Sequence, residues 1–390
     1  MATTSRDTVE ISPLRRFAPP LAAVLGLVIV AIGVGILADR NAASNLMASI
    51  YDALGNTQGA VALRNGAGDQ LAAKLVLGVL ALFVGVGGIW MLFVGVSAIV
   101  GLLSPRWQGR ILPWVFIVPA MALLTVFLIY PTVGTIVTSL TVQTNGDPLA
   151  HYKALFSPQY LGLIQNNLTW LIVGTGGSVL IGLLIAGLVD RVKREALAKT
   201  FIFLPLAISF VGASVIWRFM YEWQPGGQPQ IGLLNAVVTS VGAGPIRWVQ
   251  DQPLNTYALI LIFIWLQTGF AMVVLSAAIK GVSIEVIEAA RLDGASERQI
   301  FTRVIVPIIK GSIITVATTI AIVVLKIFDI IYVMTGGRDG TNVIANRMFQ
   351  EFYEFFNDGR AAALGTVLFI AVLPVMFVNV RNLRKQGIGS

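Results

Sequence analysis

The sequence contains no cysteine, only one histidine and few charged residues for its length. The lack of cysteine excludes disulfide bonds and thiol catalysis. Charged residues make up 12% of the 390 residues, against roughly 25% in soluble domains, whereas apolar residues make up 56%. The composition therefore predicts an integral membrane protein.

Long apolar runs recur along the chain, each near the roughly 20 residues that a helix needs to cross the hydrocarbon core of a bilayer. Polar and apolar residues do not alternate within these runs, which excludes the strands of a membrane β-barrel. A helix also satisfies its own backbone N–H and C=O groups in hydrocarbon. We therefore predict an all-α integral membrane protein with eight transmembrane helices, at Ala18–Ala38, Leu75–Leu103, Ile111–Leu140, Leu168–Val189, Phe201–Tyr221, Leu254–Ile279, Ile313–Met334 and Ala361–Val380.

The lysine and arginine residues are distributed unevenly between the segments that join these spans. Most of the 27 lie in the two tails and in the alternate loops that share a side with them. Cytoplasmic loops carry such an excess, so we predict that both termini are cytoplasmic, as an even number of spans requires. The net charge of +8 thus orients the chain in the membrane and does not indicate a nucleic-acid site.

The predicted spans divide the chain into three parts. Residues 1–17 form a cytoplasmic tail, residues 18–103 hold two helices with a short outer loop, and residues 104–390 hold a six-helix bundle. The first span resembles a signal peptide, but it is longer than a typical signal core, and Leu37-Ala38-Asp39 is a poor cleavage site. We expect a retained anchor.

One hydrophilic segment, residues 283–307, interrupts the bundle with the pattern of two helices joined by a corner. Ser283 can cap the first helix, and Gly294 supplies the left-handed residue that ends it. Ser296 opens a capping box for the second helix, and Pro307 ends the regular pattern. We predict a rigid elbow on the cytoplasmic side that can fit a socket on another protein.

The segment resembles the cytoplasmic signature of ATP-binding-cassette (ABC) importer permeases, which reads E-A-A, three residues, G, nine residues, I-x-L-P. Here it reads Glu288-Ala289-Ala290, then Gly294, then Val304-Ile305-Val306-Pro307, with Val at the two Ile/Leu positions. The resemblance implies a type I ABC importer permease fold, with the elbow in a cleft of a cytoplasmic ATPase. The coupling residues that it implies are Glu288, Ala289, Ala290, Arg291, Asp293, Gly294 and Pro307. The alternative is an amphipathic loop that merely joins two spans.

The resemblance extends from about the third span to the C-terminus. Residues 201–223, 264–281 and 325–337 are similar to carbohydrate-uptake permeases of the maltose type. The combination most similar to the alpha-glucoside branch is Tyr221–Trp223 and Gln230–Asn235 with Trp265–Met272. The enteric maltose permease carries a large periplasmic domain after its third span, where this chain has only a loop. The family implies uptake of a sugar, an alpha-glucoside or a related oligosaccharide, by alternating access across the inner (plasma) membrane.

The resemblance also implies partners. These are a second, homologous permease, two ATPase subunits at the cytoplasmic face and an extracytoplasmic sugar-binding protein. The sequence agrees with ATP hydrolysis by a separate subunit, because this chain has no Gly-Lys dipeptide and hence no Walker loop to hold the phosphates of ATP. We expect no cofactor and no enzymatic activity on this chain, with ATP and Mg²⁺ used by the partner ATPase.

Sugars are neutral and rich in hydroxyl groups, so their sites use hydrogen-bonding side chains and aromatic faces. Lys326 and Asp329 lie three residues apart on one predicted helical face of the seventh span, where a lone charge costs about 2.5–3.5 kcal/mol, so we expect each to pair with the other or with a neighbour. They either line the sugar path or form a salt bridge that orients the span. The substrate-path candidates are Ser209, Ser214, Trp265, Gln267, Thr268, Lys326 and Asp329, although helix packing also explains each of them.

Two other features lie outside the predicted spans. Apolar residues recur at helical spacing in residues 342–356, which predicts a helix on the outer rim. His151, the single histidine, falls in an outer loop, where we expect it to be solvated. With no further histidine and no H-E-x-x-H motif, we predict neither a metal site nor a membrane protease.

A secondary transporter driven by protons or sodium is the competing hypothesis. It would favour inverted repeats and broken helices with carboxylates at the membrane midplane, and we find neither in the sequence. A membrane-embedded enzyme is weaker still, because no plausible catalytic set occurs. The sequence therefore predicts the permease subunit of an ATP-driven sugar importer.

Overall fold

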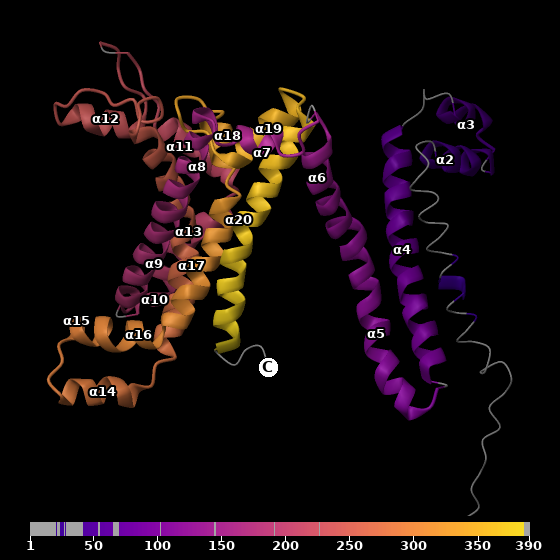
Figure 1. Cartoon of the computed structure of the whole chain (residues 1–390), viewed down its shortest axis with the longest axis horizontal. Coiled ribbons are helices and arrows are strands. Elements are labelled where there is room, and N and C mark those ends of the chain that lie inside the picture. The colour runs from indigo at the N-terminus through magenta and orange to yellow at the C-terminus, as the bar shows by residue number, and fades with distance from the viewer. Residues whose placement is uncertain are drawn as a thin grey trace, which may run out of the picture. The chain divides into compact units, whose positions relative to one another are not determined.

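The computed structural model describes residues 42–53, 55–64, 70–101, 103–143, 146–190, 192–225 and 227–385, with Leu21, Val24–Gly26 and Val28. Every regular element in these residues is a helix (Figure 1), so the all-α prediction is confirmed. The chain divides into two compact units, Met1–Pro131 and Thr132–Ser390.

The first unit holds α2 (Ala42–Ala53), α3 (Thr57–Arg64), α4 (Gln70–Gly101) and α5 (Pro105–Leu124). α4 and α5 pack against each other, with the rings of Phe93 and Phe116 stacked at 5.6 Å between centroids. A π turn, Thr125–Ile129, then leads into α6 (Tyr130–Thr141), which lies mostly in the second unit.

The second unit carries the remaining helices. In chain order these are α7 (Ala150–Ala154), α8 (Pro158–Thr169), α9 (Thr175–Val189), α10 (Glu195–Phe203), α11 (Phe210–Met220), α12 (Leu233–Ser240), α13 (Leu254–Lys280), α14 (Ile284–Leu292), α15 (Glu297–Gln299), α16 (Val306–Ile308), α17 (Lys310–Leu325), α18 (Asp329–Met334), α19 (Ile344–Tyr353) and α20 (Asp358–Lys385). In Figure 1, α14, α15 and α16 gather at one end of this unit, and α7, α12, α18 and α19 at the other. We call these the elbow end and the loop end.

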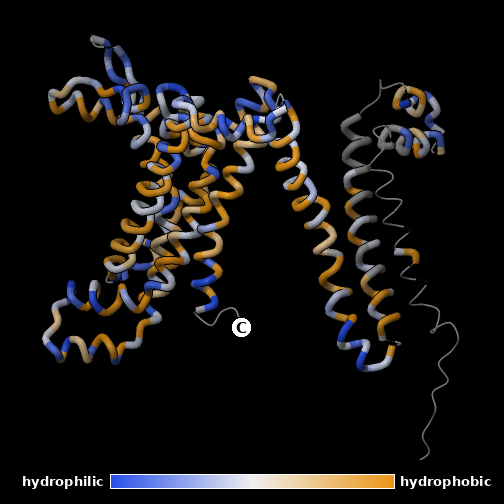
Figure 2. Tube along the Cα trace, viewed as in Figure 1, coloured by the Kyte–Doolittle hydropathy of each residue, from blue (hydrophilic) through white to orange (hydrophobic). Residues whose placement is uncertain are grey.

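Within the described residues, four helical stretches are long and apolar enough to cross a membrane: Pro105–Thr141, Pro158–Val189, Leu254–Lys280 and Asp358–Arg384. Two bent helix pairs raise the number to six if each pair counts as one span. The first predicted span falls largely outside the described residues and the second falls on α4, so eight spans stay a prediction. Figure 2 shows hydrophobic residues along the shafts of the second unit and hydrophilic ones towards its two ends.

The predicted span Phe201–Tyr221 is wrong as a single helix, because its two halves meet at 99°. α10 ends in a 3₁₀ turn, Leu204–Ala207, which contains Pro205. Ile208 and Ser209 are then extended, and the Ser209 hydroxyl accepts a 3.0 Å hydrogen bond from a backbone N–H in the first turn of α11. Ser209 thus starts a new helix, as serine commonly does.

The predicted span Ile313–Met334 is also wrong as a continuous helix. α17 ends at Leu325 and α18 begins at Asp329, and the backbone between them is not helical. At its other end, α17 meets the second arm of the elbow at 71°. Non-helical backbone within a membrane span is tolerated where protein or a water-filled cavity surrounds it.

The pair α9 and α13 makes the most extensive helix contact in the described residues. A Cβ at Gly182 would come within 2.5 Å of the Ala271 Cβ, and one at Gly177 within 2.6 Å of the Ile264 side chain. Small residues let two helix backbones approach in this way. With most of α13 buried, the pair forms the centre of the core.

At the loop end, the segment Glu222–Pro253 is held in shape by Asn235, which is fully buried. The Asn235 amide donates to the carbonyl oxygens of Glu222 and Ile246, and accepts from the Ile246 N–H and the Trp248 indole, at 2.9–3.1 Å. These bonds use the full hydrogen-bonding capacity of an asparagine side chain. The described part of the segment is therefore a fixed surface.

Candidate functional site

The elbow has the local structure that its sequence predicts. α14 ends where Gly294 adopts a left-handed backbone with a φ of +82°, a conformation that other residues adopt at a cost. Ser296 and Gln299 form a complete capping box at the start of α15. The second arm continues through a π turn, Ile300–Ile305, to α16 and ends at Ile309. The predicted two-helix corner is confirmed.

An apolar cluster anchors the inner side of the elbow to the bundle. It consists of buried Val282, Ile300, Ile305 and Ile309 with partly buried Leu183, Ala278, Ile279, Ile287, Ala290, Ala295, Phe301 and Ile313. Phe301 fills the space beside Gly187 of α9, where a Cβ would lie 2.7 Å from the ring. The elbow is therefore attached to the ends of three helices, α9, α13 and α17.

The outer side of the elbow is exposed and mixed in character. Among the predicted coupling residues, Ala290 is partly buried, whereas the exposed ones are Glu288, Ala289, Arg291, Asp293, Gly294 and Pro307. Leu292, at the end of α14, is 89% exposed, although leucine is usually buried. Arg291 forms a 3.0 Å ion pair with Glu297 of the second arm. The tip thus presents apolar and charged groups together.

Ser283 occupies the N-cap position of α14, but its side chain makes no capping bond. Its hydroxyl donates instead to the carboxylate of Glu285. That hydrogen bond lowers the pKa of Glu285 below its usual value. The carboxylate stays ionised in the first turn, where the helix dipole favours a negative charge.

A polar network lies beside the elbow, and the sequence analysis missed it. Lys199 contacts Asp190 at 2.8 Å and Glu195 at 2.5 Å, and Glu195 also contacts Lys280 at 2.5 Å. Ser276 donates to Asp190 at 2.7 Å. These side chains join the turn between α9 and α10 to the end of α13, which leads directly into the elbow.

Three predicted substrate-path residues bond within their own helices. Ser209 caps α11. Ser214 is fully buried, and its hydroxyl donates to the Phe210 carbonyl oxygen at 2.7 Å. The Thr268 hydroxyl donates to the Ile264 carbonyl oxygen, also at 2.7 Å. Their hydrogen-bonding groups are therefore already engaged by helix backbone.

The two other candidates on α13 are placed differently. Trp265 is half-buried, with its ring edge-on to Trp217 at 5.8 Å between centroids. Gln267 is 7% exposed, and its amide makes no hydrogen bond in the part of the chain that the structure describes. An amide without a protein partner can donate and accept hydrogen bonds, so this side chain suits contact with a polar ligand.

Lys326 and Asp329 lie on either side of the break between α17 and α18, so the predicted shared helical face is wrong. No ion pair joins the two side chains, both of which the structure describes. Lys326 is exposed, and Asp329 is half-buried in the first turn of α18. The charged group of each side chain can therefore interact with a group other than its neighbour.

His151 is 5% exposed, so the expected solvation of this residue is wrong. Its Nε2 lies 2.8 Å from the Val142 carbonyl oxygen. The ring also packs on Gly359, where a Cβ would come within 2.4 Å of Nε2. His151 thus fills the junction of α6, α7 and α20. The described residues contain no group of three His, Cys, Asp or Glu side chains that could hold a metal.

The helix predicted in residues 342–356 is present as α19 and carries a buried carboxylate that the sequence did not single out. Glu351 is 1% exposed. It accepts a 2.6 Å hydrogen bond from Tyr160 and forms ion pairs with Arg347 at 2.9 Å and Arg360 at 3.5 Å. This cluster ties α19 to α8 and α20.

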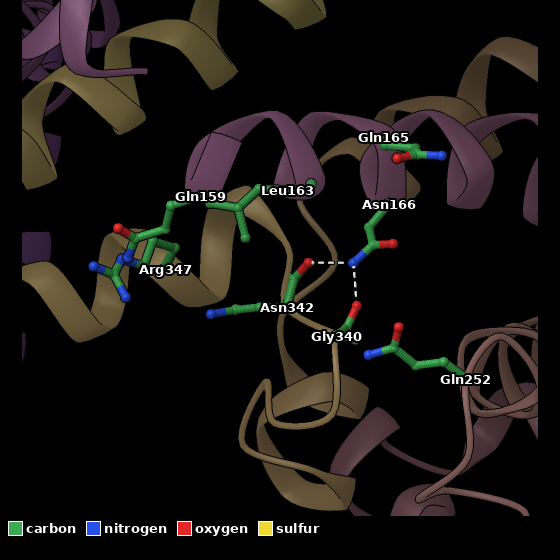
Figure 3. A pocket seen from close by; sticks show the side chains of 9 residues that line it. Gln159, Leu163, Gln165, Asn166, Gln252, Gly340, Asn342 and Arg347 are labelled. Carbon is green, nitrogen blue, oxygen red and sulfur yellow. Dashed lines mark hydrogen bonds between the residues drawn. The ribbon is translucent and has the colours of Figure 1, made fainter. Parts of the chain in front are cut away.

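A cavity of about 390 Å³ opens at the loop end beside α8, α19 and the turn before α13 (Figure 3). Its polar lining comes mainly from amides, namely Gln159, Gln165, Asn166, Gln252 and Asn342, with Arg347. Asn166 donates to the carbonyl oxygens of Gly340 and Asn342, at 2.6 and 2.8 Å. No motif in the sequence marks this cavity, because its residues come from separate segments.

A comparison with known families identifies the chain. Residues 178–385, from α9 to α20 with the elbow included, match the family described as binding-protein-dependent transport system inner membrane component. The chain belongs to this family. It is therefore a transport component of the inner membrane, as predicted, and the family argues against the secondary transporter.

Known relatives and solved structures agree with this membership. An osmoprotective compounds uptake permease of Synechocystis is 48% identical over 274 residues, 70% of this chain and 98% of that protein. An alpha-glucoside transport system permease of Rhizobium meliloti is 45% identical over 288 residues, 73% of this chain and 86% of that protein. A chain of a bacterial alginate ABC transporter, solved with an alginate pentasaccharide-bound periplasmic protein, superposes with a TM-score of 0.61 at 21% identity, covering 72% of this chain and 97% of that chain. The fold is that of a type I ABC permease.

Proposed function

We propose that this protein is the permease subunit of an ATP-driven importer of a sugar, an alpha-glucoside or a related oligosaccharide. The 45% identity to the alpha-glucoside permease supports this substrate class. The relative that takes up osmoprotective compounds agrees with it, because uncharged sugars such as sucrose also act as osmolytes. An uncharged glucoside fits both descriptions.

The observation that carries the proposal is the elbow. Its signature spacing is intact, its inner side is fixed to α9, α13 and α17, and Leu292 stands 89% exposed on its outer side. In this proposal the coupling residues, Glu288 to Arg291 with Asp293, Gly294 and Pro307, enter a cleft of a partner ATPase. Closure of the ATPase pair then moves the elbow and the attached helices, which switches access from outside to inside.

The break between α17 and α18 supports a solute path near Lys326 and Asp329. Neither charge is neutralised by the other, and non-helical backbone of this kind is tolerated within a span where protein surrounds it or where it lines a cavity. Trp265 and Gln267 add an aromatic ring and an unpartnered amide. These are the kinds of donors, acceptors and aromatic faces that a neutral sugar requires.

The proposed assembly contains a second permease, two ATPase subunits and an extracytoplasmic sugar-binding protein. The elbow end then faces the cytoplasm, with both termini, and the loop end faces the binding protein. Eight spans, including a retained first anchor, complete the topology. This chain binds no cofactor in the proposal, and the partner ATPase uses ATP and Mg²⁺.

Reconstitution of the chain with its partner subunits in vesicles tests the proposal. We expect uptake of at least one of maltose, sucrose and trehalose, with ATP hydrolysis stimulated by the sugar-loaded binding protein. Vesicles that hold only this chain are the control and accumulate nothing. Accumulation of solute against its gradient by the chain alone would contradict the proposal.

A further inference from the structure

A second cavity at the loop end, of about 470 Å³, is separate from the amide-lined one. It lies beside α11, α18 and the fixed segment Glu222–Pro253. Its chemistry comes from six side chains, namely Arg218, Glu222, Trp223, Gln250, Arg338 and Asp339. The volume falls within the range of roughly 300–1,000 Å³ that is usual for small-molecule sites.

The turn that carries two of these residues is held rigidly. The hydroxyl oxygens of Thr335 and Thr341 lie 2.6 Å apart, and both residues are buried. Asp339 adopts a left-handed backbone with a φ of +53°, and its carbonyl oxygen accepts a 2.7 Å hydrogen bond from Asn255. Backbone in such sparsely populated regions clusters at ligand sites. The turn therefore fixes Arg338 and Asp339 at the cavity.

The opposite wall offers an aromatic ring to the cavity. The Arg247 guanidinium lies 5.3 Å over the ring of Trp223 and orients it. The Oε1 atom of Gln250 is buried and has no hydrogen-bond partner in the part of the chain that the structure describes. That atom is closed off from the cavity in this conformation, so Trp223 is the group that this wall presents.

The charged side chains that line the cavity add up to no net charge. Two guanidinium groups and two carboxylates line it, and none of the four side chains forms an ion pair with a described residue. A site with no net charge does not favour an ion. Carboxylates accept and guanidinium groups donate hydrogen bonds, so the two kinds together match hydroxyl groups, which do both.

We propose that this cavity binds one ring of an uncharged glucoside, as an entry site distinct from the path at the α17–α18 break. The indole of Trp223 stacks on the apolar face of the sugar ring, and the carboxylates of Glu222 and Asp339 accept hydrogen bonds from its hydroxyl groups. The inference rests on the proposed function for the identity of the substrate. It adds a contact that the solute makes before it reaches the membrane interior.

The test measures binding of radiolabelled maltose, sucrose and trehalose to the assembled transporter in lipid nanodiscs, without the binding protein. Glu222→Gln and Asp339→Asn each remove one charged acceptor, and asparagine tolerates the left-handed backbone at residue 339. We expect each to weaken binding by about tenfold or more. Asp147→Asn is the matched control, because Asp147 pairs with Lys153 elsewhere at the loop end and leaves binding unchanged.

Three outcomes overturn the inference. In the first, sugar binding is lost in Asp329→Asn but unchanged in both cavity variants. In the second, no sugar binds to a transporter that imports one with its binding protein. In the third, the cavity variants only reduce stimulation by the binding protein, which marks a protein-docking surface. The last two leave the proposed function standing. If instead no sugar is imported, the proposed function fails, while binding that depends on Glu222 and Asp339 still supports the cavity. Size-exclusion profiles confirm that each variant assembles.

Discussion

Phe301 of the elbow lies directly on the backbone of Gly187 in α9. A Cβ at residue 187 would be 2.7 Å from the nearest ring carbon. This contact joins the elbow to a helix that does not continue into it along the chain. The absence of a side chain at Gly187 is therefore what allows the elbow to pack closely against the bundle.

Gly187→Ala tests this contact. The added methyl group forces the Phe301 ring to move, and such overpacking costs about 1–3 kcal/mol. We expect a lower melting temperature and severalfold less uptake per ATP hydrolysed by the assembled transporter. The double variant Gly187→Ala/Phe301→Leu makes room for the methyl group and restores part of both. An unchanged ratio in Gly187→Ala would show that the contact is dispensable.

Gly294 offers a purely conformational test of the elbow. Its φ is +82°, and a Cβ there meets nothing within 4 Å, so a substitution acts through the backbone alone. We expect Gly294→Val to cost about 1–2 kcal/mol locally, to abolish coupled uptake and to reduce co-purification of the ATPase. Gly294→Asn, which tolerates the left-handed region, retains most of the activity. Equal uptake by both variants speaks against the coupling role.

Lys326→Ala separates a structural role from a transport role. Lys326 is exposed and forms no ion pair with Asp329, so its removal leaves no buried charge without a partner. We expect normal amounts of assembled protein and at least about tenfold lower sugar uptake. The measurement compares the yield after size exclusion with the initial rate of uptake. Loss of assembled protein would instead assign Lys326 to helix packing.

Glu351→Ala removes the carboxylate that holds Tyr160, Arg347 and Arg360 together. Breaking a buried ion pair leaves uncompensated charge and costs about 3–5 kcal/mol. We expect a strongly lowered melting temperature in detergent. The neighbouring, exposed Glu354→Ala is the matched control and changes the melting temperature little. Equal melting temperatures for the two variants would show that the cluster adds no stability.

The elbow could be predicted from the sequence because its signals are local. Gly294 and the capping box at Ser296 act on neighbouring residues, so the chain carries the information at the site itself. The bend before α11 also had local signals in Pro205 and Ser209, but the apolar run around them outweighed these in the prediction.

The break after Leu325 could not be predicted in this way. No proline or glycine lies at residues 326–328, so the break depends on how α17 and α18 pack against their neighbours. The same holds for Glu351, whose partner Tyr160 is far away in the sequence. The partners of a charged or amide side chain can be identified only once the fold brings together the helices that carry them.

The glycine contacts between α9 and α13 also govern how motion would spread through the second unit. Gly182 lets the backbones of the two helices come into close contact at Ala271. α13 runs for 27 residues, which corresponds to about 40 Å. If the elbow moves as proposed, this contact carries its displacement along the length of α13 and α9 together.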